Sequence, residues 1–410
     1  MGEHIGTDIE LTVDKIAHGG IAVGRLDGRV VFVSDAIPGE TVRARVSDDR
    51  KKSFWRADTI EVLTPSEHRR DHIWAAAAID RDPRGRAGGA EFGHIELAHQ
   101  RELKRQVLAE ALQRMAGLET DVEVEALPGD DAANGLGWRT RIRLHVDDQG
   151  RLGPMASRSH SVIPVTDVPL ATPAVQAAAP FAERFLGYDT IDILAPHGAE
   201  ARLVLGDQKP TVISERVGDR VFALDDTGFW QVHRSAAVAL TNAVQEAIDE
   251  ALFDPRAHNL DLYGGVGLLA AAVADRFGSH TRITSVESDE RATDHASENL
   301  AEWLGASAES GRVDRWLRAL ASGASAGDRE RLRAATIVLD PPRSGAGTEV
   351  MSLLTSLEPA QLVYVACDPV ALARDVALAG QAGYVLSRIR AFDLFPHTHH
   401  VEAVATLVRA

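Results

Sequence analysis

Cysteine is almost absent from the sequence, since Cys367 is the only one among 410 residues. A single thiol cannot form an intramolecular disulfide, so a disulfide-stapled fold is excluded. Cysteine-based zinc sites and iron–sulfur clusters need several thiolates, so they are excluded as well. A lone cysteine is either a small buried hydrophobic residue or a reactive thiol, and its sequence surroundings must decide between the two.

Long apolar runs are also missing, and none approaches the about 18 residues that cross a bilayer. The segment Met1–Asp8 has no basic stretch followed by a hydrophobic one, so no secretory signal is predicted. We therefore expect a cytoplasmic protein with no membrane partner. Apolar residues make up 45% of the chain, enough for a core, and 410 residues suffice for about three domains.

Positive charge is scarce, because the formal net charge is −16. This balance argues against a sequence-wide electrostatic grip on nucleic acid, so any RNA must be held by local basic patches. Arg139, Arg141 and Arg143 alternate with uncharged residues in a predicted strand, which places them on one face. That face is either an ordinary solvated surface or a phosphate-binding patch.

The pattern of the chain changes twice. Residues 5–63 are short alternating runs separated by glycine and proline turns, which predicts a small β-barrel, of the OB type. Residues 95–117 carry a helical apolar stripe that ends at Gly117. From about residue 227, helices and strands alternate, which predicts a doubly wound parallel sheet. The expected fold class is α/β, with an N-terminal barrel and a central α+β region.

Acidic residues end three successive predicted strands. Asp261–Gly267 (D-L-Y-G-G-V-G) is a turn whose glycines let a ligand approach the backbone closely. Glu287 ends the next strand, where a carboxylate can accept hydrogen bonds from ribose hydroxyls. Asp340 ends the third. Three such residues suit a cofactor with adenosine hydroxyls and a cationic centre, although Asp261 and Asp340 could instead cap helices.

Cys367 follows a buried predicted strand and precedes a predicted helix. The N-terminus of that helix should favour a thiolate, which makes Cys367 a candidate nucleophile. The tail segment Phe392–Glu402 adds three histidines and one carboxylate. Because the histidines lack a nearby pair of carboxylates, no metal is expected there. Glu402, at the start of the last strand, is the candidate base.

Five segments closely resemble the RNA (uracil-5-)-methyltransferases of bacterial tRNA and 23S rRNA. They are Gly228–His233 (G-F-W-Q-V-H), Asp261–Gly267, Leu339–Gly347 (L-D-P-P-R-S-G-A-G), Tyr364–Pro369 (Y-V-A-C-D-P) with Leu372–Asp375 (L-A-R-D), and Asp393–Glu402 (D-L-F-P-H-T-H-H-V-E). The N-terminal part resembles the TRAM domain, an RNA-binding barrel. The resemblance runs along nearly the whole chain, and the order of its segments is highly specific.

The resemblance implies methylation of uridine C5 in structured RNA, either 23S rRNA or tRNA, with S-adenosylmethionine as cofactor. It implies a monomer with RNA as its partner. The roles carried over are the nucleophile, Cys367; the base, Glu402; and the cofactor contacts, Gln231, Tyr263, Glu287 and Asp340. The implied layout is a TRAM barrel at 1–63, a central RNA-facing domain at 64–92 and 119–226, and a methyltransferase domain at 93–118 and 227–410.

The sequence departs from the family at two places. The rRNA-type enzymes carry a four-cysteine iron–sulfur site in the segment that matches about 72–92, where this chain has no cysteine, so no cluster is expected. The usual C-N-P is C-D-P here, so Asp368 adds a negative charge beside the thiol. Two alternatives stay open: a cytosine-C5 RNA methyltransferase with the same chemistry, and a catalytically silent RNA-binding protein. Methyl transfer from labelled cofactor would separate them.

Overall fold

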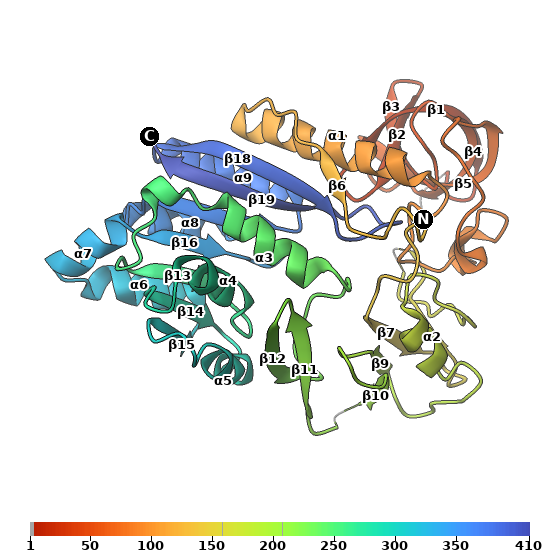
Figure 1. Cartoon of the computed structure of the whole chain (residues 1–410). Coiled ribbons are helices and arrows are strands. Elements are labelled where there is room, and N and C mark those ends of the chain that lie inside the picture. Colours follow the sequence, from red (N-terminus) through yellow and green to blue (C-terminus); the bar gives the residue numbers. More distant parts are fainter. Residues whose placement is uncertain (1–3, 158, 207) are drawn as a thin grey trace.

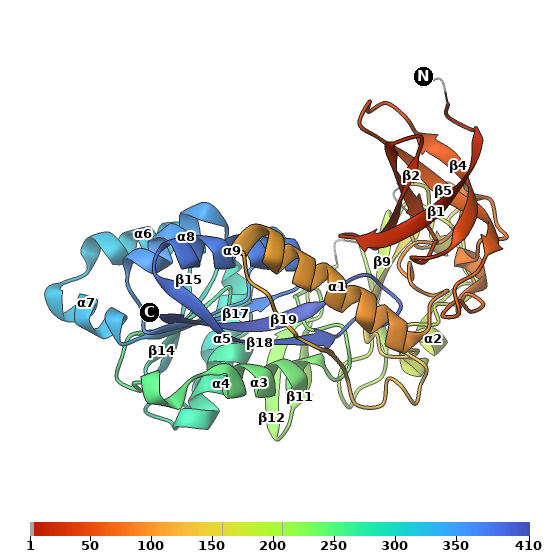
Figure 2. The ribbon, with the colours of Figure 1, turned by 90° about the horizontal axis from the view of Figure 1, so that it is seen from above.

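The computed structural model describes residues 4–157, 159–206 and 208–410. Figure 1 shows an N-terminal barrel, a central region of small sheets, and a large layered α/β unit that contains the C-terminus. Helix α1 (Leu97–Ala116) runs between the barrel and the large unit, as the view from above shows (Figure 2). In these described ranges no helix is long and apolar enough to cross a membrane.

Five strands close into the barrel that the alternating pattern predicts. Their order is β1-β2-β3-β5-β4, and the β3–β5 pair is parallel. Val13, Val31 and Val42 point inward and are fully buried, as the two-residue period requires. The strands are β1 (Asp8–Ala17), β2 (Ile21–Leu26), β3 (Arg29–Ser34), β4 (Thr41–Asp48) and β5 (Phe54–Thr64).

The central region contains a four-stranded sheet of order β10-β9-β7-β8 and a separate β11–β12 hairpin. Its elements are η1 (Ala75–Ala77), η2 (Pro83–Gly85), α2 (Pro173–Ala178), β7 (Arg141–Val146), β8 (Leu152–Gly153), β9 (Thr190–Leu194), β10 (Arg202–Leu205), β11 (Val212–Val217) and β12 (Arg220–Asp225). Arg139 precedes β7, Arg141 donates to the Gly228 carbonyl at 2.7 Å, and Arg143 pairs with Asp192 at 2.7 Å. The three arginines therefore do not form one face of unpaired cations.

The large sheet has eight strands in the order β15-β14-β13-β16-β17-β19-β18-β6. They are β6 (Val124–Ala126), β13 (Asn259–Leu262), β14 (Ile283–Glu287), β15 (Ala306–Ser310), β16 (Thr336–Leu339), β17 (Gln361–Ala366), β18 (Tyr384–Asp393) and β19 (Glu402–Arg409). The α/β prediction is confirmed, but the sheet is mixed, because β19 runs antiparallel to both of its neighbours. A loop without a helix joins β18 to β19, so the chain turns back on itself there.

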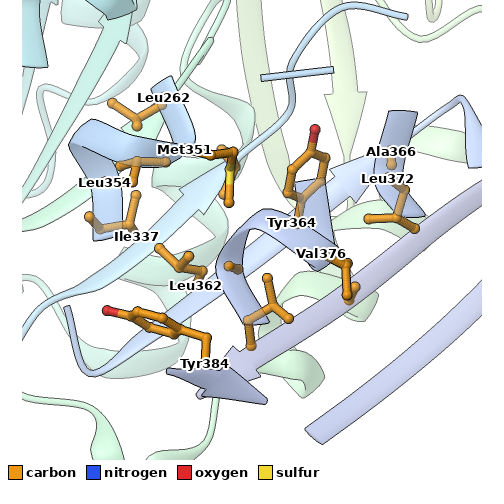
Figure 3. Close-up of a cluster of buried hydrophobic side chains, with 14 of the residues drawn as sticks. Leu262, Ile337, Met351, Leu354, Leu362, Tyr364, Ala366, Leu372, Val376 and Tyr384 are labelled. Atoms are coloured by element: carbon orange, nitrogen blue, oxygen red, sulfur yellow. The ribbon is translucent and has the colours of Figure 1, made fainter. Parts of the chain in front are cut away.

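Helices cover both faces of the large sheet. They are α3 (Ala236–Ala247), η3 (Glu250–Leu252), α4 (Leu268–Phe277), α5 (Glu290–Asn299), α6 (Val313–Gly323), α7 (Ala326–Arg333), α8 (Gly347–Ser356) and α9 (Pro369–Gln381). One core lies between the sheet and α1, α6, α8 and α9, where Met351, Leu372 and Val376 meet Tyr364 of β17 (Figure 3). A second core lies under α3, α4 and α5 on the other face.

Helix α1 ties the parts of the molecule together. It ends at Gly117, whose φ of 68° suits glycine, as predicted. On its buried side, Lys104 Nζ donates to Asp393 Oδ1 at 2.5 Å. The domain boundaries stay a proposal: the barrel's last strand ends at Thr64, and β6, which falls in the proposed central domain, pairs with β18 of the large sheet.

Candidate active site

The carboxyl ends of four neighbouring strands bring most of the predicted site residues to one edge of the large sheet. Tyr263 follows β13, Glu287 ends β14, Asp340 follows β16, and Cys367 follows β17. The strands are adjacent and parallel in the order β14-β13-β16-β17. The four side chains therefore start from a row at the edge where open α/β sheets bind their ligands.

Glu402 reaches the same edge from the opposite direction, because β19 is antiparallel to β17. Ala366 pairs with Ala403 in the register of these two strands. Cys367 and Glu402 are the next opposed positions beyond this pair. The sheet thus places the candidate nucleophile and the candidate base side by side, although each lies in a different segment of the chain.

Three buried or half-buried carboxyl groups crowd this edge. Burial raises the pKa of Asp261 to about 7, and burial together with the charge of Asp261 raises the pKa of Asp340 to about 7. Burial and the neighbouring Asp340 raise the pKa of Glu402 well above its ordinary value. Asp261 Oδ1 is buried without a hydrogen-bond partner among the described residues. Such a group of carboxyls favours a cationic ligand.

The thiol of Cys367 is half-buried, and its pKa is raised to about 12, first by burial and then by Glu402 and Asp340. The expectation that the following helix favours a thiolate is therefore wrong for the protein alone. The Asp368 carboxylate also caps α9, where it accepts hydrogen bonds from the Val370 and Ala371 amides at 3.0 and 2.8 Å. The positive end of the helix is thus met by Asp368 rather than by the thiol.

The glycine turn after β13 provides the cradle that a cofactor needs. A Cβ on Gly264 would lie 1.9 Å from Ser285 Oγ and 2.8 Å from Asp261 Oδ2, so only glycine lets the backbone pass here. Glu287 Oε2 accepts a hydrogen bond from Gly265 N at 3.1 Å, which fixes its carboxylate at the turn. A carboxylate for ribose hydroxyls and buried acids for a cation fit S-adenosylmethionine.

Gln231 does not stand at a strand end, unlike the other predicted cofactor residues. It lies in the segment between β12 and α3 and is half-buried. Within the described part of the chain, no hydrogen bond or ion pair joins its side chain to the strand ends. Its role stays a prediction that depends on the resemblance alone.

A cavity of about 240 Å³ lies beside Cys367, and three parts of the chain enclose it. The lining residues are Ala17, His18, Gly19, Gly20, Phe92, Leu103, Lys104, Val107, Arg343, Cys367, Asp368, Pro369, His399 and His400. The barrel supplies the first four, the segment around α1 supplies the next four, and loops of the large sheet supply the rest. Sequence reasoning assigned no role to His18 or Lys104, because no local pattern marks residues that come together only through the fold.

The histidine-rich loop divides into a structural part and a part that faces the cavity. His397 is buried with φ 66°; its amide donates to Gln100 Oε1 at 2.8 Å, and its Nε2 contacts the Asn134 carbonyl at 2.9 Å. Burial lowers the pKa of His397 to about 4. His399 and His400 line the cavity, and burial lowers the pKa of His400 to about 3. Among the described residues no cluster of three or more potential ligands is placed to hold a metal ion.

Two sequence families match parts of the chain. Residues 318–410 match the tRNA (uracil-5-)-methyltransferase family, and residues 3–54 match the TRAM domain. An uncharacterized RNA methyltransferase of Streptomyces avermitilis is 35% identical, with 98% of each chain covered. The 23S rRNA (uracil(1939)-C(5))-methyltransferase RlmD of Halomonas elongata is 30% identical, with 97% of this chain and 89% of the relative covered.

A solved structure of similar fold covers nearly the whole chain. It is the Pyrococcus abyssi tRNA (uracil-54, C5)-methyltransferase in complex with S-adenosyl-L-homocysteine, with a TM-score of 0.68 and 21% identity. The match covers 98% of this chain and 100% of that one. The barrel, the central region and the mixed sheet thus occur together in a second protein.

Proposed function

We propose that this chain, which belongs to the RNA (uracil-5-)-methyltransferase family, methylates C5 of a uridine through a covalent bond between Cys367 and C6 of the base. It is an RNA methyltransferase, and its cofactor is S-adenosylmethionine. The proposed substrate is a structured RNA, 23S rRNA or tRNA. The observation that carries the proposal is the strand register that opposes Cys367 to Glu402 beside Asp340.

The chemistry needs a thiol and a base because C5 of uracil is too weak a nucleophile on its own. S-adenosylmethionine supplies an electrophilic methyl group on a cationic sulfur. Addition of the Cys367 sulfur to C6 moves electron density to C5, which would then take the methyl group, with S-adenosylhomocysteine as the leaving group. A base removes the C5 proton, the C6–S bond breaks, and the thiol is released.

The electrostatics of the site support an order of events. Because Asp340 and Glu402 raise the pKa of the Cys367 thiol, any positive charge held beside them lowers it. We therefore expect Cys367 to become nucleophilic only when the site is filled. Burial and Asp340 raise the pKa of Glu402, so Glu402 can act as a base only after a cation held beside it has favoured its ionised form, and that carboxylate is then a stronger base than an ordinary one.

The target base must leave its stack to reach Cys367, so a flipped-out or looped uridine is expected. The cavity beside the thiol is lined by three parts of the chain and offers the space for such a base. Tyr263, Glu287 and Asp340 are the proposed cofactor contacts at the adjacent strand ends, and Gln231 is a further one.

The test uses RNA that contains 5-fluorouridine, because fluorine cannot be removed as a proton and the adduct is trapped. The wild-type protein with cofactor should give a protein–RNA complex that survives denaturing gels. Cys367→Ala should bind S-adenosylmethionine within about twofold of wild type yet give no complex, since no other thiol exists. A complex with the variant would overturn the role of Cys367. Trapping only by 5-fluorocytidine RNA would instead indicate a cytosine enzyme.

A further inference from the structure

The turn between β1 and β2 of the barrel reaches into the catalytic region. His18 Nε2 lies 2.7 Å from Asp368 Oδ2, the carboxylate directly after Cys367. Asp368 is largely buried, with 20% of its side chain exposed, whereas His18 is 48% exposed. The same carboxylate uses its other oxygen, Oδ1, to cap helix α9. Asp368 thus links the barrel, the nucleophile and the helix that follows it.

The turn also packs tightly against the loop that carries the histidines. A Cβ on Gly20 would lie 2.6 Å from His399 Cβ and 3.0 Å from a ring carbon of Phe92. Gly20 has φ 70°, so the backbone there also suits glycine. Ala17, His18, Gly19 and Gly20 together form one wall of the cavity beside Cys367. Without the barrel this cavity would be open on that side.

We propose that the β1–β2 turn of the barrel is part of the catalytic site, in which His18 is a positioning residue that holds Asp368, and with it Cys367, against the bound nucleotide. The barrel then has a second task besides binding RNA, because it completes the cavity that takes the target base. This inference rests on the proposed function for the identity of the nucleotide, but the contact between the turn and the nucleophile loop does not.

The charged groups around this contact are few. Lys104 from α1, Arg343 after β16, and His399 and His400 from the β18–β19 loop line the same cavity. The hydrogen bond to Asp368 raises the pKa of His18, so the contact is strongest while the imidazole is protonated. A charge-assisted hydrogen bond with one partly exposed partner contributes about a fivefold effect.

The first experiment measures the rate of adduct formation with saturating 5-fluorouridine RNA and cofactor. His18→Ala should slow this step about fivefold while the dissociation constant for RNA stays within about twofold. His18→Gln, whose amide can donate to Asp368, should recover most of the rate. Lys15→Ala is the matched control, because it removes a 2.8 Å contact from β1, the strand before the turn, to Glu110 of α1, and neither residue lines the cavity. It should leave the rate unchanged.

The second experiment needs neither RNA nor methyl transfer, because Cys367 is the only thiol to alkylate. At one pH, kept the same for every variant, the rate at which iodoacetamide alkylates Cys367 reports access to the cavity. His18→Ala and Gly20→Ala should react about fivefold faster than wild type, since either change releases the turn. Gly28→Ala is the control for Gly20, because it has a similar φ of 79° in another barrel turn with nothing within 4 Å.

The outcomes separate the two proposals. If wild-type protein forms no adduct but alkylation accelerates in the His18 and Gly20 variants, the proposed function is wrong. The proposal that the β1–β2 turn closes the cavity would then still hold. If His18→Ala weakens RNA binding without changing the adduct rate at saturation, His18 is an RNA contact and the positioning role is wrong. If the alkylation rate is unchanged in both variants, the β1–β2 turn does not close the cavity beside Cys367, and the proposal is wrong.

Asp368→Asn tests the same contact through the direction in which the rate changes with pH. An asparagine can keep the cap through its oxygen, but its amide must donate to an unprotonated His18. The ratio of the variant's adduct rate to that of wild type should therefore rise between pH 6 and pH 8.5, on the order of fivefold. A ratio that is flat across this range would mean that His18 does not act through position 368.

Discussion

Glu402 precedes Ala403, which pairs with Ala366 across two antiparallel strands, and it is our candidate for the base that the proposed reaction requires. In Glu402→Gln, thiol addition and methyl transfer should proceed, but the C5 proton then cannot leave and the thiol cannot be eliminated. We expect a covalent complex with ordinary uridine RNA that persists in denaturing gels and already contains the labelled methyl group. Glu349→Gln, at an exposed position of α8, should release methylated RNA normally.

Free methylated RNA at near-normal rates from Glu402→Gln would eliminate Glu402 as the base. His399 would be the next residue to test, because it lines the cavity. His397 is less suitable, since its Nε2 already contacts the Asn134 carbonyl and its amide is held by Gln100.

Site residues that stand in local sequence motifs could be predicted, whereas site residues that only the fold brings to the cavity could not. Cys367 and Asp340 stand at the ends of recognisable strands, so their meeting follows from sheet topology. Lys104 sits within the apolar stripe of α1, and helical periodicity does not reveal that its ammonium is fully buried against Asp393. His18 lies in a barrel turn whose partner is 350 residues away in sequence.

At the scale of elements, the parallel strand ends concentrate carboxyl groups that prefer to stay protonated. Burial and Asp261 raise the pKa of Asp340 to about 7. A raised pKa stabilises the fold below the ordinary value near 4, and this contribution is lost as pH rises through 7. Without cofactor, the change that Asp340→Asn makes in the free energy of unfolding should therefore be more favourable at pH 8 than at pH 5, by about 2 kcal/mol.

Urea unfolding at the two pH values measures this difference. Asp294→Asn, on the exposed side of α5, is the control and should change stability equally little at both. Equal effects of Asp340→Asn at pH 5 and pH 8 would show that Asp340 is not a strained carboxylate. Added S-adenosylmethionine should reduce the pH dependence of the wild-type protein, because a cation compensates the ionised acids.

Elements with a clear period were predictable, and the others had different reasons for being missed. Helix α6 has an apolar stripe that includes Val313 and Leu317, so a closer reading of the period could have found it. Helix α7 buries only Leu332 and carries little such signal. The direction of β19 depends on the loop that precedes it, and strand patterns alone do not give direction.

At the scale of the whole molecule, the segment of residues 72–92 joins the barrel to the central region without any cysteine. The side chain of Arg86 in this segment is buried, with 3% of the residue exposed. Its guanidinium donates to the Ile79 carbonyl at 2.8 Å, to the Arg81 carbonyl at 3.1 and 3.0 Å, and to Asp35 of the barrel at 2.8 Å. Trp74 Nε1 donates to Asp167 at 2.9 Å and ties the segment to the central region.

We therefore predict that this segment needs no iron and is organised by Arg86 instead. Protein purified aerobically should have no iron–sulfur absorbance and keep its activity with a chelator. Arg86→Met should lower the free energy of unfolding by about 2–4 kcal/mol, because the buried carbonyls of Ile79 and Arg81 lose their donor. Arg84→Met, two positions earlier and exposed, should change it by less than about 0.5 kcal/mol. Stoichiometric iron, or equal stability of the two variants, would contradict this account of how the barrel is held in place.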